Sequence, residues 1–290
     1  MAQAQTTRTD GLRASDAVSE QPMLELVGVQ KTYHGKRDFE AIRDVTLSVG
    51  AGEFVCVVGP SGAGKTTLLR SIAGLQRTTG GDVLLEGARV VAPPPGMAVV
   101  FQEYARSLFP WMTVRQNVRL PMKQRGMPRS ERDSRVTEVL RAVDLADVGD
   151  AYPWQLSGGM QQRVAIARAL AYEPKVLLMD EPFAAVDAQT RAELEDLVRS
   201  LWKRLGVTVL FVTHDIDESV YLGERVIVLS NSPTQVLEDL VIDLPADRDQ
   251  LGTRMLPRFA ELRAHVYARI QEAKSGARPE DGPSNASRVL

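Results

Sequence analysis

The sequence predicts an α/β fold whose mostly parallel sheet carries a phosphate-binding loop. Short apolar runs alternate with helical patterns along most of the 290 residues, and strands that alternate with helices form parallel sheets. The all-apolar run at 176–179 is typical of a strand covered on both faces. A glycine-rich run at 59–66 follows the apolar run 54–58. We therefore expect it at the carboxyl end of a strand, where parallel sheets bind ligands.

The composition is that of a soluble globular protein. Hydrophobic residues make up 44% and charged residues 25%, which allows a substantial core. The net charge of −2 argues against a generally basic nucleic-acid binder. The single cysteine, Cys56, lies in an apolar run and is expected in the core, which favours a cytoplasmic location. Residues 1–22 show no apolar signal region, and no stretch approaches the ~20 apolar residues that span a bilayer.

The first half of the chain predicts strands and then a helical insertion. A domain is expected at 23–245, between polar tails at 1–22 and 273–290 that predict disorder. From 113 to 145 the pattern is helical and charged, and Ser130–Asp133 resembles a capping box at a helix start. We expect a small helical subdomain at about 104–170. Before it, apolar runs predict strands at 24–27, 45–49, 83–85 and 98–101.

The second half returns to alternating strands and helices, as a parallel sheet requires. After Leu244 we expect a C-terminal helical extension at 246–272 with an amphipathic helix at 258–270. Between the strand at 176–179 and this extension, the patterns predict a helix at 188–205, a strand at 207–212, a helix at 216–222 and a strand at 226–229.

The run at 59–66 matches the phosphate-loop pattern G-x-x-x-x-G-K-[ST]. Its glycines let the backbone wrap closely around an anion, and successive N–H groups and the helix N-terminus point at the phosphates. Lys65 reaches the β- and γ-phosphates, and the Thr66 hydroxyl is a Mg²⁺ ligand. The sequence therefore predicts binding of a nucleoside triphosphate by Gly59, Pro60, Ser61, Gly62, Ala63, Gly64, Lys65, Thr66 and Thr67.

Two carboxylates, Asp180 and Glu181, follow the strand at 176–179. In phosphate-loop ATPases an acidic residue at this place completes the Mg²⁺ shell, which is the role expected of Asp180. The adjacent Glu181 is expected to orient or deprotonate the attacking water, and a positioned base contributes roughly 10²–10⁴-fold to a rate. The alternative is a solvated acidic turn, which the phosphate loop upstream disfavours.

A second anion-binding element precedes the helical run 164–170. Ser157 and two glycines at a helix N-terminus bind anions, and a chain with two such elements needs a reason for both. This stretch resembles the signature sequence of ABC ATPases, LSGGQ, with Met160 in the fifth position. The resemblance covers roughly residues 24–244, and the signature comprises Leu156, Ser157, Gly158, Gly159, Met160 and Gln161.

The resemblance implies a fold and an assembly. The fold is a phosphate-loop (ABC ATPase) core with an N-terminal antiparallel β subdomain and the inserted helical subdomain. In this family two nucleotide-binding domains pack head to tail, so that the signature of one closes on the phosphates held by the other. The chain is thus expected to form a homodimer that binds ATP and Mg²⁺.

Four further residues take their roles from the resemblance alone. Tyr33 matches the aromatic residue that stacks on adenine, although a tyrosine there is more often a strand end. Gln102 matches the Q-loop glutamine that senses Mg²⁺ and water, and Asp187 the D-loop aspartate at the dimer interface. His214 matches the switch histidine at the γ-phosphate. The catalytic residues expected are Glu181, His214 and Lys65, and the metal ligands are Thr66, Gln102 and Asp180.

The D-loop departs from the family pattern at two positions. Many bacterial importers read Phe-Gly-Ala-Leu-Asp, whereas this chain has Ala184 and Val186 at the second and fourth positions. If the glycine of relatives uses a positive φ, Ala184 costs about 1 kcal/mol. Because Asp187 is kept, the role of the loop is expected to remain.

Within ABC proteins the sequence is similar to the nitrate/sulfonate/taurine importer subfamily. The similarity lies in the segments 101–114, 152–155 and 243–245. The short interval between phosphate loop and signature suits a transporter, because DNA-repair relatives insert long coiled coils and no sustained heptads occur here. The subfamily implies a separate membrane permease and an extracytoplasmic solute-binding protein.

The permease contact is expected along Tyr104–Thr113, through exposed Leu108, Phe109, Trp111 and Met112. The alternative is that these side chains pack the helical subdomain onto the core. We expect an ATPase subunit at the cytoplasmic face of the membrane, with no nucleic-acid partner. Two other functions remain: a soluble ABC ATPase acting on nucleic acid or ribosomes, and a regulatory module that holds ATP, which Glu181 and His214 disfavour.

Overall fold

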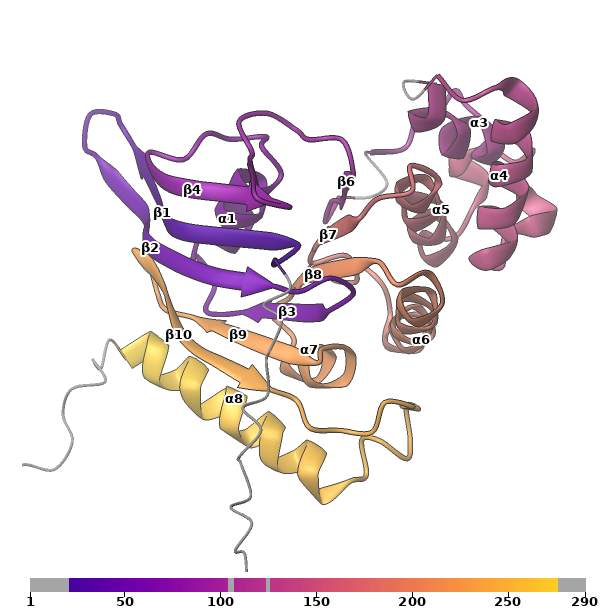
Figure 1. The fold of residues 1–290 in the computed structure, drawn as a ribbon. Coiled ribbons are helices and arrows are strands. Elements are labelled where there is room, and N and C mark those ends of the chain that lie inside the picture. Colours follow the sequence, from indigo (N-terminus) through magenta and orange to yellow (C-terminus); the bar gives the residue numbers. More distant parts are fainter. Residues whose placement is uncertain (1–20, 104–106, 124–125, 276–290) are drawn as a thin grey trace, which may run out of the picture.

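The structure, a computed structural model, describes residues 21–103, 107–123 and 126–275. A single sheet of ten strands runs through these residues, in the order β5-β4-β1-β2-β10-β9-β3-β8-β7-β6. Figure 1 shows the helices α3, α4 and α5 gathered beside one end of this sheet and α8 lying along β9 and β10. No helix in the described ranges has the length and apolar character of a membrane span.

Five neighbouring strands, β9, β3, β8, β7 and β6, form the predicted parallel part of the sheet. β3 pairs in parallel with β8 and β9, and β7 pairs in parallel with β6 and β8. Every residue of β3, β7 and β8 is buried, as expected for strands covered on both faces. The five strands span Phe54–Val58 (β3), Met97–Val100 (β6), Val176–Asp180 (β7), Thr208–Val212 (β8) and Arg225–Leu229 (β9), within one residue of the predicted ends.

The N-terminal strands form an antiparallel part, also as expected. β1 lies between β2 and β4, and β4 pairs with β5. β10 (Thr234–Val241) joins the two parts, because it is parallel to β2 and antiparallel to β9. β10 was not predicted, since most of its side chains are partly exposed and carry no clear alternation. The other strands span Leu24–Tyr33 (β1), Phe39–Val49 (β2), Gly80–Leu85 (β4) and Ala88–Arg89 (β5).

Alternate residues of β3 enter two separate hydrophobic cores, one on each face of the sheet. Phe54, Cys56 and Val58 face the core that includes α5, α6, α7 and α8, while Val55 and Val57 face the core under α1. Cys56 is buried, as predicted, and burial raises the pKa of its thiol. The helices are α1 (Lys65–Ile72), α6 (Ala188–Leu205), α7 (Ile216–Leu222) and α8 (Pro257–Ser275).

The predicted helices in this half are confirmed at α6 and α7, whose ends match the sequence patterns. α8 is longer than expected. It continues to Ser275, so residues 273–275, which were expected in a disordered tail, are helical. Its Phe259, Leu262, Val266 and Ile270 are buried in the first core, and Ala273, beyond the predicted end, is buried as well.

The helices between β6 and β7 pack on one another (Figure 1). The capping box predicted at Ser130 is wrong. α4 already begins at Arg129 after Pro128, and no side chain caps it. The observed box lies at Thr113, whose hydroxyl accepts from the Gln116 N–H. These elements are α3 (Val114–Arg119), η1 (Pro121–Lys123), α4 (Arg129–Ala142), η2 (Ala146–Val148), η3 (Pro153–Gln155) and α5 (Gly158–Ala171).

Candidate active site

The phosphate loop connects the buried end of β3 to the first turn of α1. Gly64 caps α1 with a left-handed backbone, φ 69°. A Cβ atom on Gly64 would lie 2.9 Å from Thr234 Oγ1, and one on Gly59 would lie 3.1 Å from the Leu229 carbonyl oxygen. Position 64 therefore requires glycine, because its left-handed backbone disfavours a side chain and Thr234 crowds it, while Gly59 is crowded by Leu229 without an unusual backbone.

The Lys65 ammonium lies against the backbone carbonyls at the start of this loop. Its Nζ donates to the carbonyl oxygens of Gly59 at 3.0 Å and Pro60 at 3.1 Å, and lies 3.9 Å from Glu181 Oε1. Burial lowers the pKa of Lys65, while the carboxylates of Glu181 and Asp180 oppose that change. Since its partners are neutral carbonyls and one distant carboxylate, the ammonium is available for a phosphate group.

Asp180 and Thr66 meet beside Lys65. Asp180 is the last residue of β7 and is buried, and its Oδ1 accepts from the Thr66 hydroxyl at 3.2 Å. Burial raises the pKa of Asp180, and the hydrogen bond from Thr66 opposes this. A carboxylate and a hydroxyl next to a phosphate cradle are the hard oxygen ligands that Mg²⁺ takes in nucleotide sites. The residues therefore fit a magnesium ion bound together with phosphates.

Glu181 connects three parts of the site. Its backbone takes a positive φ of 43°, which is uncommon for a residue other than glycine and concentrates at functional sites. Its N–H donates to the Val212 carbonyl of β8 at 2.9 Å. Its Oε2 lies 2.9 Å from His214 Nδ1, so the carboxylate is held between His214 and Lys65.

These groups surround a cavity of about 500 Å³. It brings together seven residues of the loop, Ser61–Thr67, with Glu181 and His214. Sequence reasoning missed Phe39, Ala41 and Ser232, which also line it. The available signal was Phe39, an exposed aromatic residue that pairs with Tyr33 across β1 and β2.

Four residues assigned to nucleotide binding lie outside the lining of this cavity: Gly59 and Pro60 at the start of the loop, and Tyr33 and Gln102. Tyr33 ends β1 and is 40% exposed. Its hydroxyl accepts from Gln76 Nε2 at 2.7 Å and lies 3.2 Å from the Thr67 hydroxyl, which places the ring beside the loop. Gln102 follows β6 and is exposed.

The signature lies at the N-terminus of α5. Ser157 caps this helix and accepts from the Met160 N–H at 3.3 Å, while Gln161 Nε2 donates to the carbonyls of Pro153 and Leu156. Ser157 and Gly158 are exposed. None of the six signature residues lines the cavity at the phosphate loop, so the described chain does not bring its two anion-binding elements together.

The D-loop aspartate is tied to the signature through Thr190. Asp187 caps α6, and its carboxylate accepts from the Thr190 N–H at 3.0 Å and the Thr190 hydroxyl at 2.7 Å. These hydrogen bonds lower the pKa of Asp187. A Cβ atom on Gly159 would lie 2.4 Å from Thr190 Cγ2. The glycine of the signature is therefore needed for close packing on the start of α6.

The strain expected at Ala184 is absent. Among the described residues, the non-glycine positions with positive φ are Glu86, Asp144, Glu173 and Glu181. The Ala184 N–H instead closes a turn onto the Glu181 carbonyl at 3.2 Å. The unusual conformation thus falls three residues earlier, at Glu181.

The segment expected to meet a permease is partly buried. Tyr104 lies outside the described residues. The expected exposure of Leu108 is wrong, because this side chain joins the core of the helical elements. The segment is held down by buried Asn117, whose amide donates to the carbonyls of Phe109 and Met112.

Aromatic surface remains next to this segment. Trp111 and Trp154 are each 69% exposed. Trp111 packs edge-on against Phe109, and Trp154 stacks on Tyr152. We call Trp111, Tyr152 and Trp154 the aromatic patch.

Fold and site together define a class. A phosphate loop after β3, two carboxylates after β7 and a histidine after β8 meet at the carboxyl ends of neighbouring parallel strands, which is the arrangement of a phosphate-loop ATPase. A family model described as ABC transporter matches residues 42–184. The chain belongs to the ABC transporter family, as an ATP-binding subunit.

Curated relatives and solved structures agree with this. The nitrate import ATP-binding protein NrtD of Synechocystis sp. is 47% identical over 227 residues, 78% of this chain and 85% of the relative. An uncharacterised ABC transporter ATP-binding protein of Methanocaldococcus jannaschii is 48% identical, over 77% of this chain and 83% of the relative. The ATP-binding cassette MJ0796, dimeric and bound to ADP and Pi, is 36% identical with a TM-score of 0.68, over 76% of this chain and 99% of that structure.

Proposed function

We propose that two copies of this chain form the ATP-hydrolysing engine of an importer for small anions of the nitrate type. The observation that carries the proposal is the separation of the exposed signature from the cavity at the phosphate loop. The N-terminus of α5 is suited to bind an anion, and the cavity of its own chain does not reach it. The arrangement that supplies one is a head-to-tail dimer, in which Leu156–Gln161 of one copy covers the nucleotide held by the other.

The functional residues in and around the cavity each have a role in this proposal. Lys65 leaves the carbonyls of Gly59 and Pro60 and binds the β- and γ-phosphates. Thr66 and Asp180, together with Gln102, hold Mg²⁺, which neutralises phosphate charge when bound. Glu181 takes a proton from the attacking water. His214 fixes the orientation of Glu181 and contacts the γ-phosphate. Tyr33 stacks on the adenine ring, and Asp187 meets the partner copy.

A complementation experiment tests the dimer. Lys65→Ala removes the phosphate ligand, and Gly158→Asp places a carboxylate where the signature would meet the γ-phosphate. Each variant alone is expected to be inactive. Co-expressed, they form mixed dimers in which one site combines an intact loop with an intact signature, so part of the ATPase activity returns. If each chain held a complete site, no mixture of the two variants would recover activity.

The transport partners follow from the relatives. Two of them are a nitrate import and a bicarbonate transport ATP-binding protein, which supports a small inorganic anion as the solute. The subunit would sit on the cytoplasmic face of the membrane, bound to permease subunits through the aromatic patch and Phe109. A solute-binding protein outside the membrane would deliver the anion.

Purification of the tagged chain from its native membrane tests this assignment. We expect a polytopic permease in the complex and ATP-dependent nitrate uptake when the complex and its binding protein are reconstituted in vesicles. Recovery of RNA, DNA or ribosomes in place of a permease would instead support a soluble ABC ATPase.

A further inference from the structure

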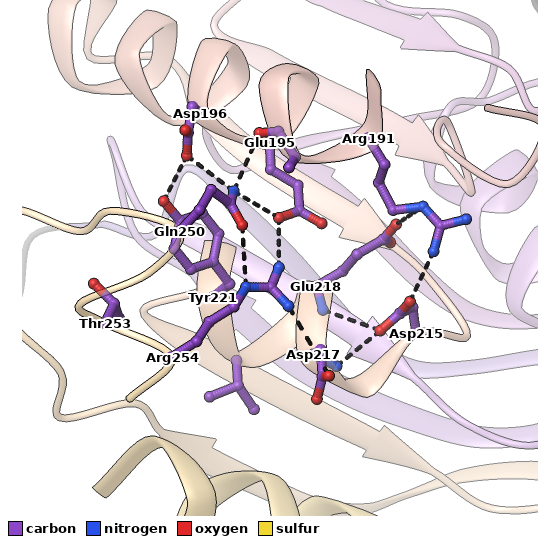
Figure 2. Close-up of polar contacts among 12 residues, drawn as sticks. Arg191, Glu195, Asp196, Asp215, Asp217, Glu218, Tyr221, Gln250, Thr253 and Arg254 are labelled. Atoms are coloured by element: carbon purple, nitrogen blue, oxygen red, sulfur yellow. Dashed lines mark hydrogen bonds and ion pairs between the residues drawn. The ribbon is translucent and has the colours of Figure 1, made fainter. Parts of the chain in front are cut away.

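Arg191 lies in the first turn of α6 and contacts residues from two separate loops. Its Nη1 donates to Asp215 Oδ2 at 3.1 Å, and its Nε lies 3.6 Å from Glu218 Oε1. On the other side its Nη2 donates to the Val186 carbonyl at 3.5 Å. Figure 2 shows the guanidinium pointing at the two carboxylates from above α7.

The two carboxylates fix the loop that carries His214. Asp215 follows the histidine directly, and its Oδ1 caps α7 by accepting from the N–H groups of Asp217 and Glu218. Thr213 precedes the histidine. Its hydroxyl donates to Glu218 Oε2 at 2.5 Å and accepts from the Asp215 N–H at 2.9 Å. His214 is thus held on both sides by the pair that Arg191 binds.

The third contact of Arg191 belongs to the D-loop. Val186 immediately precedes Asp187, the cap of α6, and the Asp187 carbonyl accepts from the Arg191 N–H at 2.9 Å. The side chain of Arg191 is 31% exposed and that of Glu218 is 5% exposed. The Arg191–Asp215 pair is also partly withdrawn from water, with side chains 31% and 30% exposed, so its attraction is screened less than that of a fully exposed pair.

We propose that Arg191 is a positioning residue for ATP hydrolysis, which holds the D-loop and the His214 loop at a fixed spacing. The inference rests on the proposed roles of Asp187 and His214. A head-to-tail partner would press on the D-loop, and Arg191 would pass the resulting shift to the histidine that orients Glu181. Misplacement of a catalytic group by about 1 Å can cost 10²-fold in rate, so a lost tether lowers kcat.

The chain offers a matched control in Arg254. Its guanidinium binds Glu195 Oε2 at 2.7 Å, lies 3.9 Å from Asp217 Oδ2 and stacks over Tyr221. It therefore neutralises the same acidic cluster (Figure 2). Its charge is equivalent to that of Arg191, but the groups it binds, Glu195 of α6 and Asp217 of α7, include neither a D-loop residue nor a neighbour of His214.

The experiment measures kcat and KM for ATP in the full chain. Arg191→Gln is expected to lower kcat at least 10-fold with KM within roughly 3-fold of the parent. Arg191→Lys keeps the charge but offers one ammonium for three acceptors, so its kcat is expected to fall between those of the parent and Arg191→Gln. Arg254→Gln is expected to lower the melting temperature and leave kcat within 2-fold. Equal kcat values for Arg191→Gln and Arg254→Gln would overturn the inference.

Asp215→Asn provides a second variant, because its remaining oxygen still caps α7 while the charge that Arg191 binds is lost. Its kcat is expected to fall, and adding Arg191→Gln should then have a smaller effect than in the parent. An unchanged kcat in Asp215→Asn overturns the tether even if Arg191→Gln does not fold.

His214→Ala separates this inference from the proposed function. If His214→Ala keeps full activity, the proposed role of the histidine is wrong. If His214→Ala is inactive while Arg191→Gln behaves like Arg254→Gln, only the tether is wrong.

Discussion

The imidazole of His214 and the carboxylate of Glu181 are direct neighbours, with Nδ1 2.9 Å from Oε2. The histidine comes from the end of β8 and the glutamate from the end of β7, two strands that pair in parallel. The same carboxylate faces the Lys65 ammonium at 3.9 Å. The carboxylate is therefore held between the histidine that follows β8 and the lysine that begins α1.

Replacing Glu181 with glutamine tests its role as the base. The amide has the same size and still bonds His214, but it cannot accept a proton from water. We expect ATP hydrolysis to fall at least 10²-fold while ATP affinity is retained. ATP should then trap a dimer that is visible by size-exclusion chromatography. An unchanged rate of ATP hydrolysis in this variant would show that Glu181 is not the base.

Two glycines of the phosphate loop form a matched pair for substitution by alanine. Gly62 and Gly64 have φ values of 79° and 69°, but a Cβ on Gly62 meets nothing within 4 Å, whereas one on Gly64 meets Thr234 Oγ1 at 2.9 Å. In both alanine variants the free energy of unfolding should fall by roughly 1–2 kcal/mol, because alanine is disfavoured in a left-handed backbone. Gly64→Ala should lose more and should bind ATP more weakly. Urea unfolding and equilibrium ATP binding measure both effects. Equal losses of stability and affinity in the two variants would contradict the proposed crowding of position 64 by Thr234.

Glu218 makes the stability of the fold depend on pH near neutrality. Burial raises its pKa to about 7 from the ordinary 4.5, with Asp215 and Glu195 adding to the rise and Arg191 opposing it. A raised carboxyl pKa means that the folded state holds the proton more tightly than the unfolded state. The resulting stabilisation is complete below the unfolded pKa and is lost as pH rises through about 7.

Glu218→Gln should remove this dependence. The free energy of unfolding of the parent minus that of the variant is expected to fall between pH 5 and 8 by on the order of 2 kcal/mol. Urea titrations of both proteins across this range provide the measurement. A difference that rises with pH would show that the carboxylate is stabilised by its neighbours rather than opposed by burial.

The aromatic patch should carry permease binding. Trp111→Ala removes a 69% exposed indole and is expected to weaken co-purification of the permease several-fold, since exposed tryptophans are frequent hot spots. Thermal stability should change little. Met255, which is 82% exposed on the segment before α8, is the control, and Met255→Ala should leave co-purification intact. If both variants co-purified the same amount of permease, the permease would have to bind at another surface.

The strands and helices that build the site could be read from the sequence, because they obey local rules. β3 is a continuous apolar run, and β7 and β8 each contain four consecutive apolar residues, while α6 is bounded by Asp187 as a cap and Gly206 with φ 62°. Motifs at such strand ends must meet when the strands are parallel. For this reason Lys65, Asp180, Glu181 and His214 could be placed together in advance.

What could not be predicted depends on contacts between distant segments. β10 is a strand only because β2 and β9 flank it, and it brings Thr234 against the phosphate loop. Leu108 belongs to an apparently exposed aromatic run, but Asn117 draws that run onto the core. The network of Arg191 joins residues from two loops, and no local pattern signals it.

In the proposed site, the ring of Tyr33 is the contact for the base of the nucleotide. Its hydroxyl already contacts Gln76 and Thr67, and Lys31 Nζ lies over one face of the ring at 5.2 Å from the centroid, which leaves the other face for a base. A ring face attracts purines and pyrimidines alike and reads none of their polar edges. The proposed stacking contact would therefore not distinguish adenine from the other bases.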